Sequence, residues 1–126
     1  MIFARAVLIF AFFGLAGCAG VPTADGATLR LASAEFRDYV ERVFREQNRV
    51  ADEVAFALEA PGSPSNELAA AEQEMLAACE GVNELATARR DGRRLGMRDS
   101  VRAARTVPDC ERATRAADAR LSRDPE

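Results

Sequence analysis

Between residues 28 and 60, apolar side chains recur at alternating spacings of three and four positions. This spacing matches the turn of an α-helix, so one long amphipathic helix is predicted over this range. The apolar positions are Phe36, Val40, Val43, Val50, Val54 and Ala57, with Gln47 at the one polar position of the series. The residues that widen this stripe to one side are Tyr39, Phe44, Ala51 and Leu58. A stripe of this width predicts a helix that packs against two neighbours.

A second helix is predicted over residues 64–90, after the turn-forming sequence Pro61-Gly62-Ser63-Pro64. Ser63 is a candidate N-cap and Pro64 a candidate first helical residue, where a missing backbone N–H removes no helix hydrogen bond. The apolar positions at helical spacing are Leu68, Ala71, Met75, Cys79, Val82 and Ala86. Because the connection is short, we expect the two helices to be antiparallel neighbours.

The helical pattern stops at Gly92 and resumes after Gly96, which predicts a third helix over residues 97–106. Pro108 follows and allows two interpretations: it kinks one long C-terminal helix, or it begins a fourth helix over residues 108–121. The remaining apolar positions fit both: Cys110, Ala113, Ala117 and Leu121. No strand-type alternation is present. The predicted fold is therefore all-α, a small antiparallel bundle of three to four helices.

The first 17 residues have the pattern of a secretory signal peptide. Arg5 supplies a positive charge, and an unbroken apolar run extends from Ala6 to Phe13. A helix that spans a bilayer needs about 20 apolar residues, so this run is too short to remain as a mature span. Residues 18–27 are small and turn-prone, which predicts a flexible tether to a helical domain over residues 28–126.

The sequence Leu15-Ala16-Gly17-Cys18 directly follows the apolar run and resembles the lipobox of bacterial lipoproteins. The resemblance implies cleavage before Cys18 and attachment of a diacylglycerol and an acyl chain such as palmitate to that cysteine. Such a lipid anchors the domain stably to a membrane of the cell envelope, facing the periplasm. Ala19 stands where an inner-membrane retention signal has Asp, which favours the outer membrane. The alternative is an ordinary secreted protein with an early cysteine.

The other two cysteines, Cys79 and Cys110, form an even pair in a compartment where disulfides persist. The midpoint between them falls inside the Gly92 to Gly96 break. If the chain reverses there, each cysteine lies the same number of residues from the turn, so the two would face each other on antiparallel helices. This arrangement predicts a disulfide. The alternative is two buried free thiols. A metal site is excluded because no further Cys or His completes a tetrahedral set.

Charge is distributed unevenly along the chain. Residues 18–84 carry 13 acidic residues and 5 arginines, whereas residues 85–107 carry 7 arginines and 2 acidic residues. The arginines that would form one stripe on a continuous helix are Arg90, Arg94, Arg98, Arg102 and Arg105. This patch is a candidate site for lipid phosphate, a glycan or an acidic partner. Alternatively, the same arginines face the acidic surface of the first two helices within the domain.

Composition argues against catalysis and against nucleic-acid binding. The chain has neither His nor Lys, so the usual general base and the commonest metal ligand are missing, and no cofactor motif is present. The net charge of −3 does not suit a general nucleic-acid binder. We therefore expect a noncatalytic envelope lipoprotein that acts through protein contact, with an envelope partner or a second copy. The alternative is a module that binds anionic lipid or glycan through residues 89–105.

Overall fold

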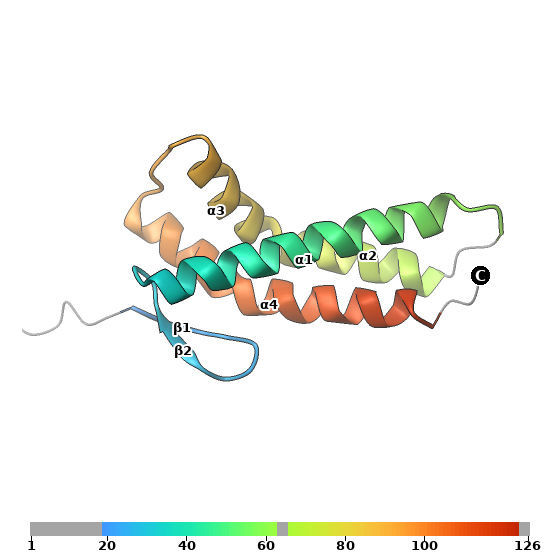
Figure 1. The fold of residues 1–126 in the computed structure, drawn as a ribbon, viewed down its shortest axis with the longest axis horizontal. Helices are drawn as coiled ribbons and strands as arrows, with labels where there is room; N and C mark the ends of the chain where they lie inside the picture. The colour runs from blue at the N-terminus through green and yellow to red at the C-terminus, as the bar shows by residue number, and fades with distance from the viewer. Residues whose placement is uncertain (1–18, 63–65, 124–126) are drawn as a thin grey trace, which may run out of the picture.

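The computed structural model describes residues 19–62 and 66–123. A two-stranded hairpin precedes four helices packed as a small bundle, so the predicted all-α class is correct apart from the hairpin (Figure 1). The elements are β1 (Gly20–Pro22), β2 (Thr28–Arg30), α1 (Ala34–Glu59), α2 (Asn66–Ala78), α3 (Glu80–Arg90) and α4 (Met97–Leu121). The predicted signal peptide, Cys18 and the predicted Ser63 cap lie outside the described residues.

Helix α1 begins at Ala34, six residues later than predicted. Its start is set by Ser33, whose Oγ accepts a hydrogen bond from the backbone N–H of Phe36 at 3.1 Å. The residues buried along it follow the predicted spacing: Phe36, Tyr39, Val43, Gln47, Val50 and Val54. The helix ends at Glu59, directly before Ala60 and Pro61, where the residue preceding a proline is biased away from helical geometry.

The hairpin replaces most of the predicted flexible tether, and it also takes the first residues expected in α1. Strands β1 and β2 pair antiparallel, with Val21 opposite Leu29. Gly26 adopts a φ of 87° in the connecting turn, a conformation that a side chain disfavours. Val21 is 2% exposed and joins the core of the bundle. The tether prediction was wrong for these residues because two three-residue strands are too short to show a period in the sequence.

The helix predicted over residues 64–90 is divided at Cys79. The backbone of Cys79 has φ −92° and ψ 1°, and α3 starts at the next residue. Gly81 permits a close approach to α4: a Cβ built at this position would lie 3.1 Å from the carbonyl oxygen of Ala103 and still closer to the Thr106 hydroxyl. Figure 1 shows α3 leaning away from α1 beyond this point.

Helix α4 continues through Pro108 as one helix from Met97 to Leu121. This decides between the two interpretations of the proline: it lies inside one long helix and starts no fourth segment. Proline removes a backbone donor and opposes helix continuation. Here the helix continues because packing stabilises it around the proline: Val107, Pro108 and Cys110 are all buried in the interior.

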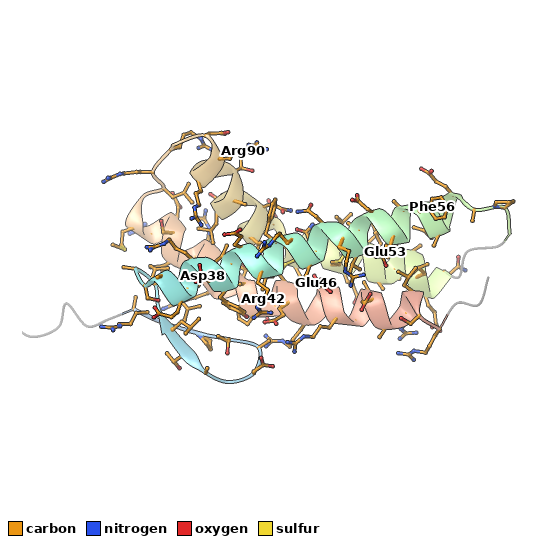
Figure 2. The ribbon with its side chains drawn as sticks, viewed as in Figure 1. Asp38, Arg42, Glu46, Glu53, Phe56 and Arg90 are labelled. Atoms are coloured by element: carbon orange, nitrogen blue, oxygen red, sulfur yellow. A yellow bond between two sulfur atoms is a disulfide. The ribbon has the colours of Figure 1, made fainter. Side chains whose placement is uncertain are left out.

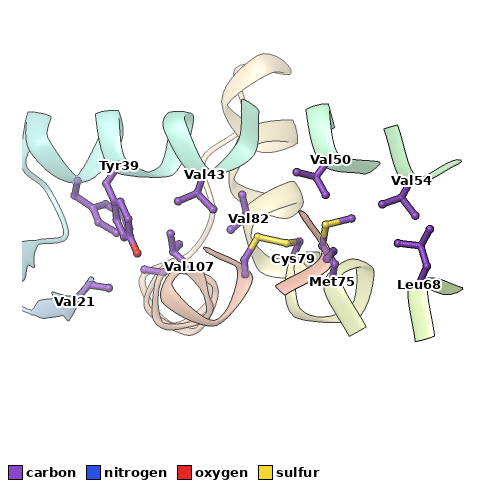
Figure 3. Close-up of a cluster of buried hydrophobic side chains, with 14 residues drawn as sticks. Val21, Tyr39, Val43, Val50, Val54, Leu68, Met75, Cys79, Val82 and Val107 are labelled. Atoms are coloured by element: carbon purple, nitrogen blue, oxygen red, sulfur yellow. A yellow bond between two sulfur atoms is a disulfide. The ribbon is translucent and has the colours of Figure 1, made fainter. Parts of the chain in front are cut away.

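The core runs along the contact of α1 with α2, α3 and α4, and the predicted disulfide lies within it. Cys79 and Cys110 are bonded, both are fully buried, and their Cα atoms are 4.5 Å apart. Figure 3 shows the bond among Val43, Val82 and Met75, with Val107 nearby. The described core residues all fall between positions 21 and 117. A chain that begins at residue 18 therefore contains the whole described core.

Candidate binding groove

An open groove of about 800 Å³ lies between the first half of α1, helix α3 and the segment that leads into α4. Its floor is apolar and comes from two helices. The floor residues are Phe36, Val40 and Phe44 of α1 and Leu85, Ala86 and Ala88 of α3. Val40 and Phe44 belong to the wide apolar stripe of α1 that the sequence predicts. Because α3 leans away from α1, part of this stripe is left open where a second neighbouring helix was expected.

Arginine side chains also line the groove, and we call them its rim. The arginines that line the groove are Arg37 of α1, Arg89 and Arg90 of α3, and Arg93 of the following loop. Arg90 and Arg93 share one acidic partner, Asp91, at 3.4 Å and 3.8 Å. Figure 2 shows Arg90 at the outer end of α3. Arg37 and Arg89 form no ion pair within the described part of the chain. The rim is therefore positively charged, and Glu41 is the acidic residue of the lining.

The arginine patch predicted from the sequence is only partly assembled. Residues 91–96 form no helix, so the five arginines do not share one helical face. Arg90 lines the groove, whereas Arg102 binds Asp99 at 2.9 Å and Glu84 at 3.8 Å. Arg94, Arg98 and Arg105 are exposed and have no ion pair among the described residues. Thus the intramolecular alternative holds for Arg102 alone among these five, since Arg90 pairs only with its chain neighbour.

Sequence reasoning missed Arg37 altogether, and it placed Arg89 and Arg93 in the candidate segment 89–105 without naming them as members of the cationic patch. Arg37 precedes the floor residue Val40 by three positions, so helical spacing places the two on neighbouring parts of the α1 surface. That spacing was the only available signal. The approach of Arg37 to Arg89 and Arg93 depends on how α3 crosses α1, which the sequence pattern does not specify.

A second cluster of charged groups lies where α1, α4 and the hairpin meet. The carboxylate of Glu111 is 5% exposed and accepts hydrogen bonds from the Tyr39 hydroxyl at 2.7 Å and from Arg42 at 3.0 Å. Arg115 donates a further bond at 2.7 Å and also pairs with Asp25 of the hairpin at 3.4 Å. Both carboxylate oxygens of Glu111 thus accept hydrogen bonds. We interpret this cluster as the connection that holds the hairpin and α1 on α4.

The electrostatics of this cluster support a structural role. Burial of Glu111 opposes its ionisation, but the bonds from Tyr39 and Arg42 and the charge of Arg115 outweigh it and hold its pKa below the usual range. Burial and the bond to Glu111 raise the pKa of Tyr39 to about 12. At neutral pH the carboxylate is charged and the phenol neutral, so neither group is poised to exchange a proton.

None of the described helices is long and apolar enough to cross a membrane. Within the same residues, no three Cys, Asp or Glu side chains gather in a way that could hold a metal ion. Comparisons with protein-family models, with curated proteins and with solved structures find no match.

Proposed function

We propose that this chain is a noncatalytic lipoprotein of the bacterial envelope, lipidated on Cys18, that holds its groove against an anionic membrane surface. One observation carries the proposal. The carbonyl oxygen of Ala19 accepts a hydrogen bond from the backbone N–H of Leu31 at 3.1 Å, and Leu31 lines the groove. A lipid on the preceding residue would therefore keep the groove close to the bilayer.

The distribution of charge supports this orientation. In Figure 1 the start of β1, the start of α1 and the loop between α3 and α4 lie at one end of the bundle. Four arginines lie in these segments or directly beside them and are free of ion pairs in the described structure: Arg37, Arg89, Arg94 and Arg98. Basic residues near an anionic lipid surface add to the attachment given by an acyl anchor. The lipid and the arginines would thus attach the same end of the bundle to the membrane surface.

The anchor is tested by growing cells with a fatty-acid probe and isolating the protein. The wild-type chain is expected to take up the label, and a Cys18→Ala chain is expected to take up none. Cys79→Ala provides a matched control, because it removes a cysteine without removing the lipidation site. Labelling of the Cys18→Ala chain would exclude the anchor.

The orientation is tested with a chain that begins at residue 18 and carries Cys18→Ala, mixed with vesicles of phosphatidylglycerol and phosphatidylcholine. Reversal of Arg94 and Arg98 to Glu is expected to abolish vesicle binding. The control reverses Arg112 and Arg123, which are also exposed and give the same change in net charge. Equal losses in the two double variants would indicate a general charge effect and contradict the proposed orientation.

A second candidate function is protein contact, either with an envelope partner or with a second copy. It is favoured by Phe56, which is 78% exposed and projects from α1 far from the groove (Figure 2). Among the large hydrophobic side chains of the described residues, Phe56 has the highest exposure. If the contact joins two copies, sedimentation velocity should show a dimer that Phe56→Ser converts to a monomer. A wild-type monomer would exclude self-association.

A further inference from the structure

We propose that the groove binds a single anionic membrane lipid, with an acyl chain on the apolar floor and the phosphate among the arginines of the rim. This inference deepens the proposed function by naming the ligand of the groove. It concerns a lipid molecule held in a site, whereas the proposed function concerns orientation on a membrane surface.

The floor has the chemistry that an acyl chain requires. Val40, Phe44 and Leu85 are partly exposed, and they are exposed into the groove that they line. The volume of about 800 Å³ falls in the range of sites for small organic ligands, about 300–1,000 Å³. Met97, at the edge, is 75% exposed and extends the apolar surface with a flexible side chain. These residues lose contact with water if a hydrocarbon chain covers them.

The rim has the chemistry that a phosphate requires. Four arginines and one acidic residue, Glu41, line the groove, and Asp91 lies outside the lining. Asp91 is already shared by Arg90 and Arg93, and Glu41 lies 3.8 Å from Arg45. Arg37 and Arg89 therefore keep their full donor capacity. A guanidinium group binds phosphate oxygens through two parallel N–H donors, which makes a pair of such groups suited to a lipid headgroup.

The position of the groove favours a lipid over an acidic peptide. Leu31 lies at the groove and is bonded to Ala19, one residue after the proposed anchor. Phospholipids are then the anionic molecules at highest local concentration. They also combine the two features of the site, because one molecule carries both a hydrocarbon chain and a phosphate. An acidic peptide would match the rim but not a floor formed by six apolar residues.

The test uses the chain from residue 18 with Cys18→Ala, which contains the whole described core, and isothermal titration below the micelle concentration. Dodecyl phosphate is the probe. Dodecyl maltoside keeps the hydrocarbon chain but lacks the phosphate, and butyl phosphate keeps the phosphate but has a short chain, so the two serve as controls. We expect saturable binding of one dodecyl phosphate, at least tenfold tighter than either control. Shortening the chain should weaken binding by roughly threefold to fourfold per methylene group.

Substitutions in the groove lining, with controls elsewhere, locate the site. Ala86→Trp places a large side chain on the floor and is expected to lower affinity at least tenfold, whereas Ala77→Trp, at an exposed position of α2, is expected to have no effect. Ala32→Trp, at an exposed lining position, gives the same test if Ala86→Trp unfolds the chain. For the rim, Arg37→Glu with Arg89→Glu is compared with the double reversal of Arg112 and Arg123.

The proposal is overturned if dodecyl maltoside binds as tightly as dodecyl phosphate, or if Ala86→Trp and Ala32→Trp both bind like the wild type. It is also overturned if the two double reversals weaken binding equally. These results are independent of the proposed function, because the chain used carries no lipid and no vesicle is present. If the fatty-acid label or vesicle binding were absent, the proposed anchor or orientation would be wrong, but saturable binding of dodecyl phosphate in the groove would still be expected.

Discussion

The two sides of α1 differ in how many of their charged side chains have an ion-pair partner. We call the contact of α1 with α4, α2 and the hairpin the closed side, and the groove between α1, α3 and residues 91–100 the open side. On the closed side, Glu111 joins Tyr39 and Arg42 of α1 to Arg115 of α4. On the open side, Arg37 and Arg89 have no ion pair in the described structure.

The same contrast holds further along α1. Arg49 binds Glu46 at 2.6 Å, Glu53 at 2.8 Å and Asp118 of α4 at 3.1 Å. Its hydrogen bonds to Glu46 lower the pKa of that carboxyl. Arginines of the closed side thus have acidic partners on neighbouring helices, whereas on the open side Arg90 and Arg93 share one adjacent partner, Asp91. From this difference we expect the closed side to contribute most of the stability of the domain, and we propose the open side as the place where a ligand binds.

The largest predicted effect is loss of the disulfide, which joins α4 to the residue between α2 and α3. Replacing Cys79 and Cys110 with Ala removes a crosslink across 31 residues and should lower the free energy of unfolding by roughly 3–4 kcal/mol. Urea unfolding of the chain with and without a reductant measures this change. A double variant as stable as the oxidised wild type would show that helix packing alone holds the bundle together.

The next effect concerns Glu111. Glu111→Gln should lower stability at pH 7 by up to about 3 kcal/mol, because it removes a buried charged acceptor. Since folding lowers the pKa of Glu111, its contribution is complete above its usual value of 4.5 and is lost as pH falls from there through the folded pKa. As pH falls below 4.5, the free energy of unfolding should therefore decrease less in Glu111→Gln than in the wild type. The exposed Glu41→Gln is the control, and an unchanged acid limb in Glu111→Gln would contradict the assignment.

A smaller loss is predicted at the crossing of α3 and α4. Gly81→Ala forces a Cβ against Ala103 and Thr106, and should cost about 2 kcal/mol by overpacking. The Thr106 side chain can rotate, but the Ala103 backbone cannot move away while the nearby disulfide fixes the two helices. Thermal unfolding measures the change, with Ala86→Gly as a substitution of the opposite kind on the same helix. A Gly81→Ala chain of wild-type stability would mean that this crossing is looser than the structure indicates.

One substitution should strengthen the closed side. Gln47 is 3% exposed, and its side-chain oxygen is buried without a hydrogen-bond partner. Gln47→Leu removes this oxygen while keeping a side chain of similar size, so stability should rise by about 1 kcal/mol. Denaturant unfolding measures the gain, and Asn48→Leu at the neighbouring exposed position serves as the control. A loss of stability in Gln47→Leu would show that the polar group has an unrecognised partner.

The smallest effect is expected on the open side. Arg89→Glu should change the melting temperature by less than about 3 °C, because Arg89 is exposed and has no ion pair among the described residues. Differential scanning calorimetry gives this value beside that of Glu111→Gln. A large destabilisation by Arg89→Glu would remove the distinction between the two sides.

Much of the fold follows from sequence pattern. The spacing of Phe36, Val43 and Val50 predicts the buried face of α1, and the equal arms around Gly92 to Gly96 predict the bond between Cys79 and Cys110. These features are local or depend on a chain reversal marked by glycine. The hairpin was missed because its strands are short, and the division at Cys79 was missed because the apolar spacing continues across it.

By itself, therefore, the sequence determined the helical class, the buried face of α1 and the cysteine pair, because periodicity and spacing report which residues must leave water together. It also predicts the lipid anchor at Cys18, which awaits its test. Only the tertiary structure decided that Arg37, Arg89 and Arg93 surround one apolar groove. The reason is geometric: the angle at which α3 leaves α4 depends on the close approach at Gly81 and on the crosslink, and no period in the sequence encodes that angle.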